Sequence, residues 1–188
     1  GTVDAGSINN AHRDVSINAL GTRGYVYAGG LVGTMQEGVI TNSSATGSVA
    51  AFAHKKSGSA VAGGLVGGGN VAIAMSWASG AVKATGGGSA YAGGLIGVLD
   101  SGYVVASYSL GNAAVVKAAN VVMSGGFVGQ TDIGNVSSSY STGSVSAPHA
   151  FYGGFVGFNS ATCSADYWDT DTSGRSEGNG GCDGSGIS

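Results

Sequence analysis

The most regular pattern along the chain is a seven-residue segment in which apolar residues flank a pair of glycines. The first glycine of each pair falls at position 29, 63, 93, 125 or 153, so successive copies lie 34, 30, 32 and 28 residues apart. Periods of this length are typical of stacked supersecondary units. The pattern therefore predicts a repeat protein with coils of about 30 residues. The five copies occupy residues 27–33, 61–67, 91–97, 123–129 and 151–157.

A second motif follows each of the first four copies at nearly constant distance. Its glycine lies 18, 17, 18 and 18 residues after the first glycine of the preceding pair, at Gly47, Gly80, Gly111 and Gly143. The strand that follows alternates, with Val49 and Ala51 on one face. We expect these small apolar residues to face inward and the variable stretch after them to be a loop.

The glycine-pair segment is itself interpreted as one strand whose two faces are both small or apolar. In the first copy, Ala28, Gly30 and Val32 share one face, and Tyr27, Gly29 and Leu31 share the other. If the alanine side points inward, the core is thin and the tyrosines and leucines form an exposed stripe. We favour the tyrosine side pointing inward, since the glycines then make room for large neighbours.

Composition supports strands and turns over other classes. The 188 residues include 38 glycines, one proline and only 9% charged residues, with 43% hydrophobic residues. This is too apolar for a disordered linker, and glycine does not recur at every third position as in collagen. Each recurrent glycine would cost about 1 kcal/mol inside a helix. The predicted fold is an all-β, right-handed parallel β-solenoid of about five coils.

The copies of Tyr-Ala-Gly-Gly-Leu-Val-Gly, together with the downstream Ser-Tyr-Ser-Thr-Gly-Ser-Val element at 139–145, resemble the GLUG-motif repeats of large bacterial surface proteins. These include adhesins and the repeat regions of IgA-cleaving metallopeptidases. The resemblance covers roughly residues 25–173. It implies a secreted or surface-attached solenoid without catalytic residues in its repeats. The chain lacks the His-Glu-x-x-His zinc motif that those peptidases carry in a separate domain.

Within this fold we expect three parts: an N-terminal partial repeat or cap over 1–24, the repeat solenoid over 25–162 and a C-terminal cap over 163–188. Residues 10–17 align with 42–49, as the second half of a repeat whose first half is missing or diverged. In that alignment His12 and Asp14 share a strand face, which with a serine hints at a hydrolase. No Gly-x-Ser-x-Gly nucleophile elbow accompanies them, so two polar residues on a capping strand is the preferred interpretation.

The C-terminal cap holds both cysteines. In a secreted protein Cys163 and Cys182 are expected to form a disulfide that closes the cap. The same segment contains Asp169-x-Asp171-x-Ser173, which matches the first half of a calcium loop. Its twelfth position is a glycine rather than a glutamate, so calcium is a weak candidate and no cofactor is required by the sequence.

Net charge limits the partners. The chain carries ten acidic and seven scattered basic residues, for a net charge of −3. Seven scattered basic residues do not make the basic stripe that nucleic-acid binding needs.

There is no run of 18 apolar residues to span a membrane. The first residues lack the features of a signal peptide, which for a surface protein indicates a processed mature chain.

Two ladders are candidate sites, because equivalent residues of a parallel solenoid stack on successive rungs. A polar turn recurs after each glycine pair, at Glu37, Asn70, Asp100, Asp132 and Asn159. Asp100 and Asp132 on neighbouring rungs could share a cation or act as paired carboxylates, although Asp and Asn are also common turn formers. The aromatic residues of the second motif align as Trp77, Tyr108 and Tyr140, either exposed as a platform for sugars or buried as filling for a corner.

The sequence thus predicts a non-enzymatic extracellular structural or adhesive module, either a cell-surface adhesin or a subunit that stacks end to end into a filament. Its partners are then other copies of itself or a glycan or protein at a host or bacterial cell surface. The alternative is a β-helix that binds or cleaves polysaccharide, with Asp100 and Asp132 as acids and Trp77, Tyr108 and Tyr140 as sugar platforms.

Overall fold

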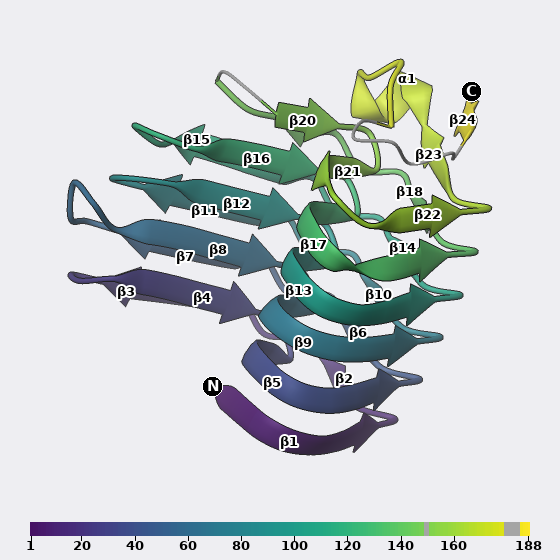
Figure 1. Cartoon of the computed structure of the whole chain (residues 1–188), viewed down its shortest axis with the longest axis horizontal. Helices are drawn as coiled ribbons and strands as arrows, with labels where there is room; N and C mark the ends of the chain where they lie inside the picture. Colours follow the sequence, from purple (N-terminus) through teal and green to yellow (C-terminus); the bar gives the residue numbers. More distant parts are fainter. Residues whose placement is uncertain (149–150, 179–184) are drawn as a thin grey trace.

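The computed structural model describes residues 1–148, 151–178 and 185–188, and within them the chain winds as a parallel β-solenoid of about five turns (Figure 1). Each full coil contributes four strands, and each strand pairs in parallel with its equivalents in the coils before and after. The expected right-handedness stays a prediction.

The strands form four sheets that run along the solenoid, named sheets A to D here. Sheet A contains long strands: β1 (Thr2–Asn9), β5 (Val32–Thr41), β9 (Val66–Ala74), β13 (Ile96–Val105), β17 (Val128–Ser137), β21 (Val156–Asn159) and β22 (Thr162–Ser164). Sheet B contains short ones: β2 (His12–Arg13), β6 (Ser44–Ala45), β10 (Trp77–Ala78), β14 (Tyr108–Ser109), β18 (Tyr140–Ser141), β23 (Tyr167–Asp169) and β24 (Ser185–Ile187).

Sheets C and D complete each coil. Sheet C contains β3 (Ile17–Gly21), β7 (Val49–Ala53), β11 (Val82–Gly86), β15 (Ala113–Lys117) and β19 (Val145–Ser146). Sheet D contains β4 (Tyr25–Gly29), β8 (Ser59–Gly63), β12 (Ala90–Gly93), β16 (Val122–Gly125) and β20 (Phe151–Gly153). A single helical turn, α1 (Thr170–Ser173), follows β23.

Two separate cores give the molecule its outline. Sheets C and D pack together as a thin arm around alanines and valines, such as Ala62, Val82 and Ala84. Sheet A curves and, with sheet B, encloses a wider body filled by leucine, isoleucine and phenylalanine. Figure 1 shows the arm as hairpin-like pairs of strands on the left and the body as the curved strands on the right.

The glycine pair is a corner between arm and body, so the expectation of one continuous strand is wrong. In the second copy, β8 ends at Gly63 and β9 begins at Val66. A Cβ on Gly64 would lie 2.1 Å from the Gly94 carbonyl oxygen of the next coil, and one on Gly63 would lie 1.9 Å from the Val66 carbonyl oxygen. Only glycine fits where backbones approach this closely.

Because the chain turns at the corner, neither predicted facing is right for the whole segment. Ala62 before the corner is buried in the arm, and Leu65 after it is buried in the body. Tyr27 and Tyr91 point outward from sheet D and remain partly exposed. The alternation after the second motif is confirmed, since Val49 and Ala51 are buried.

The N-terminal residues continue the solenoid. Strand β2 pairs His12 with Ser44, and β3 pairs Ile17 with Val49, so the alignment of 10–17 with 42–49 is confirmed. The first half of that unit is not missing, because β1 pairs along β5. At the C-terminal end, the Gly154 amide donates to the Glu177 carbonyl and the Val156 amide to the Gly178 carbonyl, both at 3.0 Å. Residues 177–178 therefore cover the last glycine corner.

Candidate functional site: two outer surfaces of the solenoid

The predicted aromatic ladder exists and lies on the outer face of sheet B. Trp77, Tyr108 and Tyr140 pair rung to rung. Their rings are nearly parallel, with centroids 5.7 Å and 5.0 Å apart and interplanar angles of 2° and 5°. Tyr140 is 39% exposed, so the ladder is a surface feature and not filling for a corner. We call these three residues the aromatic row.

The row continues on to a residue that sequence reasoning missed. Tyr167 on β23 pairs with Tyr140 and is 44% exposed. It was overlooked because Asp166 replaces the serine that precedes the ring in the other units. The usable signal was its position 27 residues after Tyr140, close to the spacing of the last two glycine pairs.

A ladder of buried serines holds the row in register. Ser76, Ser107 and Ser139 each donate their hydroxyl to a carbonyl two residues earlier. Each also accepts the amide of the equivalent residue one coil before, as in Ser76 N to Ser107 Oγ at 3.2 Å. The short strands of sheet B are therefore positioned by hydrogen bonds inside the body, which leaves the alternate residues to point outward.

Asp166 ends the serine ladder with a buried carboxylate. Its Oδ1 accepts the Ser139 amide at 2.9 Å and its Oδ2 accepts the Ser164 amide at 3.1 Å. Burial raises the pKa of Asp166 to about 6, although these two hydrogen bonds act in the opposite direction. No sequence signal singled out this group.

The residues of the predicted polar ladder lie on strands of sheet A and not in turns, but they do not form one column. Asn70 pairs with Ser101, and Asn159, the last residue of β21, pairs with Thr131. Leu99 pairs with Thr131 and Ser101 with Ile133, so Asp100 and Asp132 occupy equivalent positions on neighbouring rungs. Burial and the nearby Asp132 carboxylate raise the pKa of Asp100. Gln130 Nε2 donates to Asp132 Oδ1 at 2.5 Å.

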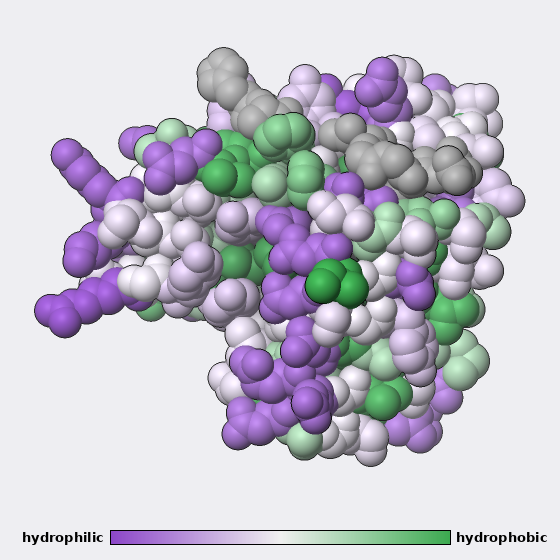
Figure 2. All heavy atoms as spheres, in the orientation of Figure 1, coloured by the Kyte–Doolittle hydropathy of each residue, from purple (hydrophilic) through white to green (hydrophobic). Residues whose placement is uncertain are grey.

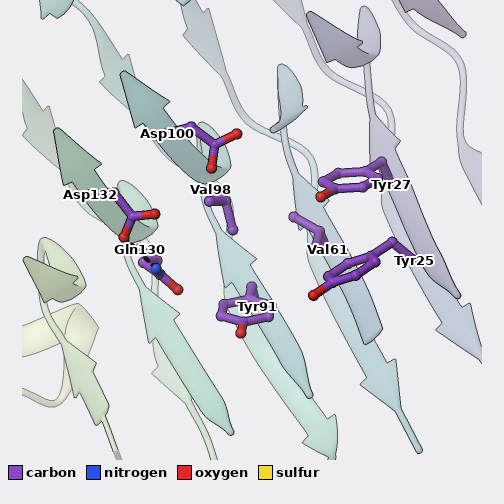
Figure 3. Close-up of a pocket in the computed structure, with 8 residues that line it drawn as sticks. All are labelled: Tyr25, Tyr27, Val61, Tyr91, Val98, Asp100, Gln130 and Asp132. Carbon is purple, nitrogen blue, oxygen red and sulfur yellow. Dashed lines mark hydrogen bonds between the residues drawn. The ribbon is translucent and has the colours of Figure 1, made fainter. Parts of the chain in front are cut away.

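The two carboxylates face tyrosines across the junction of arm and body. A cavity of about 190 Å³ is lined by Tyr25, Tyr27, Val61, Tyr91, Val98, Asp100, Gln130 and Asp132 (Figure 3). We call it the junction groove. Burial first, and then the Asp100 charge, raise the pKa of Tyr27. Figure 2 shows hydrophilic residues following the line where the arm meets the body.

The structure does not bring the two predicted ladders into one site. Trp77 lines a different pocket, with His12, Arg13, Asp14, Ser44 and Thr46. The carboxylates and Trp77 therefore line separate pockets, and the alternative function that combined the two ladders stays a prediction. The tyrosines of the junction groove were missed, because the preferred facing placed them inside.

The His12 pocket contains part of the arrangement that hinted at a hydrolase. His12 Nδ1 lies 2.8 Å from Ser44 Oγ. Asp14, however, accepts a hydrogen bond from Thr46 Oγ1 at 2.8 Å. The carboxylate is thus engaged with its own rung neighbour and does not orient the imidazole as a catalytic relay would require.

The weak calcium candidate is used structurally. Asp169 is the N-cap of α1, and its Oδ1 accepts the amides of Asp171 and Thr172 at 2.9 and 3.1 Å. These hydrogen bonds, those from Thr172 foremost, lower the pKa of Asp169. Ser173 is buried, and its Oγ accepts the Arg175 amide. Among the described residues, no three His, Cys, Asp or Glu side chains are grouped to hold a metal ion.

The predicted disulfide stays a prediction, because Cys182 lies outside the described residues. Cys163 is buried in β22, where Asn159 Nδ2 lies 3.6 Å from its sulfur.

Basic residues are less scattered than the sequence indicated. The loops at the tip of the arm stack on one another, with the His54 amide donating to Gly21 and the Ala119 amide to Gly88. They carry or flank Arg23, Lys55, Lys56 and Lys117. Long hydrophilic side chains project from this tip in Figure 2.

The fold and its surfaces define a β-solenoid repeat protein with an outward aromatic row and a tyrosine–carboxylate groove. The family model described as "The GLUG motif" matches residues 24–50, which span β4 to the start of β7. The chain therefore contains a GLUG motif within a parallel β-solenoid, and the predicted resemblance is confirmed over residues 24–50. Neither the comparison with curated proteins nor the comparison with solved structures gives a match. No helix in the described ranges has the length and hydrophobicity to cross a membrane.

Proposed function

We propose that the chain is a non-enzymatic extracellular adhesive module that contacts a glycan or protein at a cell surface through the aromatic row. The observation that carries this proposal is the parallel stacking of the Trp77, Tyr108 and Tyr140 rings on the outside of sheet B. Exposed aromatic rings of this kind are enriched where proteins bind partners, since they bury a large area at low entropic cost. The rigid solenoid holds the rings at fixed spacing, so little ordering is needed on binding.

The test compares the Trp77→Ala/Tyr108→Ala variant with the wild type on an array of glycans and extracellular-matrix proteins. Tyr103→Ala is the matched control, because Tyr103 is a 50% exposed aromatic residue on β13 outside the row. We expect the row variant to lose binding that the wild type and the Tyr103 variant retain. Equal binding by all three proteins would refute the role of the row, provided that circular dichroism shows all three folded.

Stacking of copies end to end is the second candidate. Strands β1, β2, β3 and β4 of the first coil pair on one side only within the described residues. Val3 and Ile8 of β1 pack against the body core and are only partly covered. Unpaired parallel edges of this kind accept additional strands. Electron microscopy and light scattering of residues 1–188 test this candidate, and a monomer at all concentrations would exclude it.

A further inference from the structure

The junction groove is a polar cavity that shares no lining residue with the aromatic row. Its walls come from both regions of the molecule: Tyr27 and Tyr91 from sheet D of the arm, and Asp100 and Asp132 from sheet A of the body. Tyr27 and Tyr91 occupy the same column, with Val61 on the rung between them. Figure 3 shows the tyrosines on one side of the groove and the two carboxylates on the other.

The floor of the groove is small and apolar, which leaves the rings accessible. Gly68 and Val98 pair on successive rungs below the tyrosines. A Cβ on Gly68 would lie 3.1 Å from Cε1 of the Tyr27 ring, so the absence of a side chain lets this ring lie over the strand. Tyr25 stacks on Tyr27 with centroids 5.9 Å apart and supports it from outside.

The charge of the groove is uncompensated. No lysine, arginine or histidine is among its lining residues, while two carboxylates lie on neighbouring rungs about 4.8 Å apart by strand spacing. Like charges this close repel one another, and a cationic group between them relieves the repulsion. The groove therefore favours a positive group next to carboxylates and a ring or apolar surface next to the tyrosines.

We propose that the junction groove binds a glycan of amino sugars, with Asp100 and Asp132 contacting its ammonium groups and Tyr27 and Tyr91 packing against its rings. The proposal rests on the adhesive function above and names a ligand class for it, at a surface other than the aromatic row. Equivalent positions stack along the solenoid axis, so an oligosaccharide that lies along the groove meets Asp100 on one rung and Asp132 on the next. Val98, which is partly exposed, contacts a C–H face of the sugar.

Isothermal titration calorimetry with residues 1–188 tests the proposal using three probes. A glucosamine tetrasaccharide has both rings and ammonium groups, its N-acetylated counterpart has the rings alone, and spermine has the ammonium groups alone. We expect only the glucosamine oligomer to bind well, with affinity that falls as salt is added. Asp100→Asn/Asp132→Asn, which keeps side-chain shape, should weaken it about tenfold or more, as expected for lost charge-assisted hydrogen bonds.

The controls separate this site from the aromatic row. Trp77→Ala/Tyr108→Ala should leave glucosamine binding unchanged. Array binding that also survives in this variant would refute the role of the aromatic row alone and leave the groove proposal standing. Equal binding of the acetylated oligomer would show that charge is not recognised, and equal binding of spermine that rings are not. Either result, no binding of the glucosamine oligomer, or an unaffected Asp100→Asn/Asp132→Asn variant overturns the proposal.

Discussion

The arm and the body are built from the same coils, yet they solve the problem of burying two sheets differently. In the arm, sheets C and D meet through alanines and valines, so the two layers lie close together and no large side chain separates them. In the body, the curved strands of sheet A leave space that Phe127, Phe155 and Leu65 fill. The comparison shows how one repeat can set two different thicknesses through side-chain volume alone, and the junction groove lies where the two thicknesses meet.

The largest loss of stability is expected for a mutation in the core of the body. Phe127 is fully buried and stacks on Phe155 of the next coil, with centroids 4.8 Å apart and an interplanar angle of 7°. Phe127→Ala should lower the free energy of unfolding by about 3–5 kcal/mol, because it leaves a cavity that the rigid coils do not close. Urea denaturation measures this loss. In the arm, Val82→Ala removes two methyl-sized groups and should cost only about 2 kcal/mol. Equal losses at the two positions would contradict the proposed difference in packing.

The corner that joins the two regions should be nearly as sensitive. Gly64→Ala would place its Cβ 2.1 Å from the Gly94 carbonyl oxygen and 2.7 Å from Ala78 Cβ. Backbone on both sides must move, so we expect a loss of about 3 kcal/mol, at the upper end of overpacking costs. Thermal unfolding followed by circular dichroism measures the effect. Gly1→Ala is the control, since nothing lies within 4 Å of a Cβ there, and a Gly64→Ala variant as stable as this control would refute the close approach.

Much of this corner could be predicted, but not its angle. The repeated glycine pairs gave the period, the parallel stacking and the equivalence of positions such as Asp100 and Asp132. They did not reveal that Gly63 and Gly64 turn the chain, because a Gly-Gly step fits both a strand and a bend. Because of this ambiguity, the favoured interpretation places Tyr27 and Tyr91 inside the core. The junction groove, which these two tyrosines line, therefore could not be predicted. The reason is physical: the bend is imposed by contacts between coils, which no local pattern records.

The aromatic row was predicted more completely. It depends only on period and alternation, since Trp77, Tyr108 and Tyr140 follow a serine at constant phase in each coil. Its exposure did not follow from the sequence, because an outward and an inward ring have the same alternation. The buried Asp166 was not foreseen either, since its burial depends on the coil before it and on Ser139 in particular.

Acidity should distinguish the body from the arm, because the buried carboxylate lies in the body. The pKa of Asp166 is about 6 in the folded protein, whereas the usual value for an aspartate side chain is 3.8. Between these values the folded protein binds more protons than the unfolded chain, so the contribution of Asp166 to stability falls as the pH rises from about 4 to 6. The full difference corresponds to at most about 3 kcal/mol, and screening by solvent reduces it.

Asp166→Asn should abolish this part of the pH dependence. Denaturation is measured at several pH values for the wild type, for Asp166→Asn and for Asp4→Asn, which changes an exposed carboxylate on β1. We expect the difference in unfolding free energy between the wild type and Asp166→Asn to change across pH 4–6 by about 3 kcal/mol or less, while Asp4→Asn follows the wild type. Parallel profiles of unfolding free energy against pH for all three proteins would contradict the raised pKa of Asp166. Absolute stability is a poorer readout, since asparagine offers one acceptor for the two amides of Ser139 and Ser164.

The smallest effect concerns the corner after sheet A, which belongs to the body alone. Six residues there have left-handed backbone, with φ between 47° and 54°: Asn10, Asn42, Met75, Ala106, Ser138 and Ala165. They are the positive-φ residues other than glycine in the described ranges, and they recur once per coil. This conformation costs an ordinary L-residue about 1–2 kcal/mol, and asparagine tolerates it best.

Ala106→Asn should therefore stabilise the protein by about 0.5–1 kcal/mol, since Ala106 is exposed and Asn42 already occupies the same position in an earlier coil. Ala50→Asn is the matched change on a strand of the arm, where asparagine is disfavoured and a small loss is expected. Melting temperatures of the two variants, measured side by side, test whether asparagine stabilises the corner of the body and not the strand of the arm. A gain at both positions would point to a general benefit of asparagine on this surface, whereas a gain at Ala106 alone ties the stabilisation to the left-handed corner. In the first coils this corner is occupied by asparagine, which tolerates the left-handed conformation. In the later coils the packing of the body imposes the same conformation on residues that do not favour it, namely Met75, Ala106, Ser138 and Ala165.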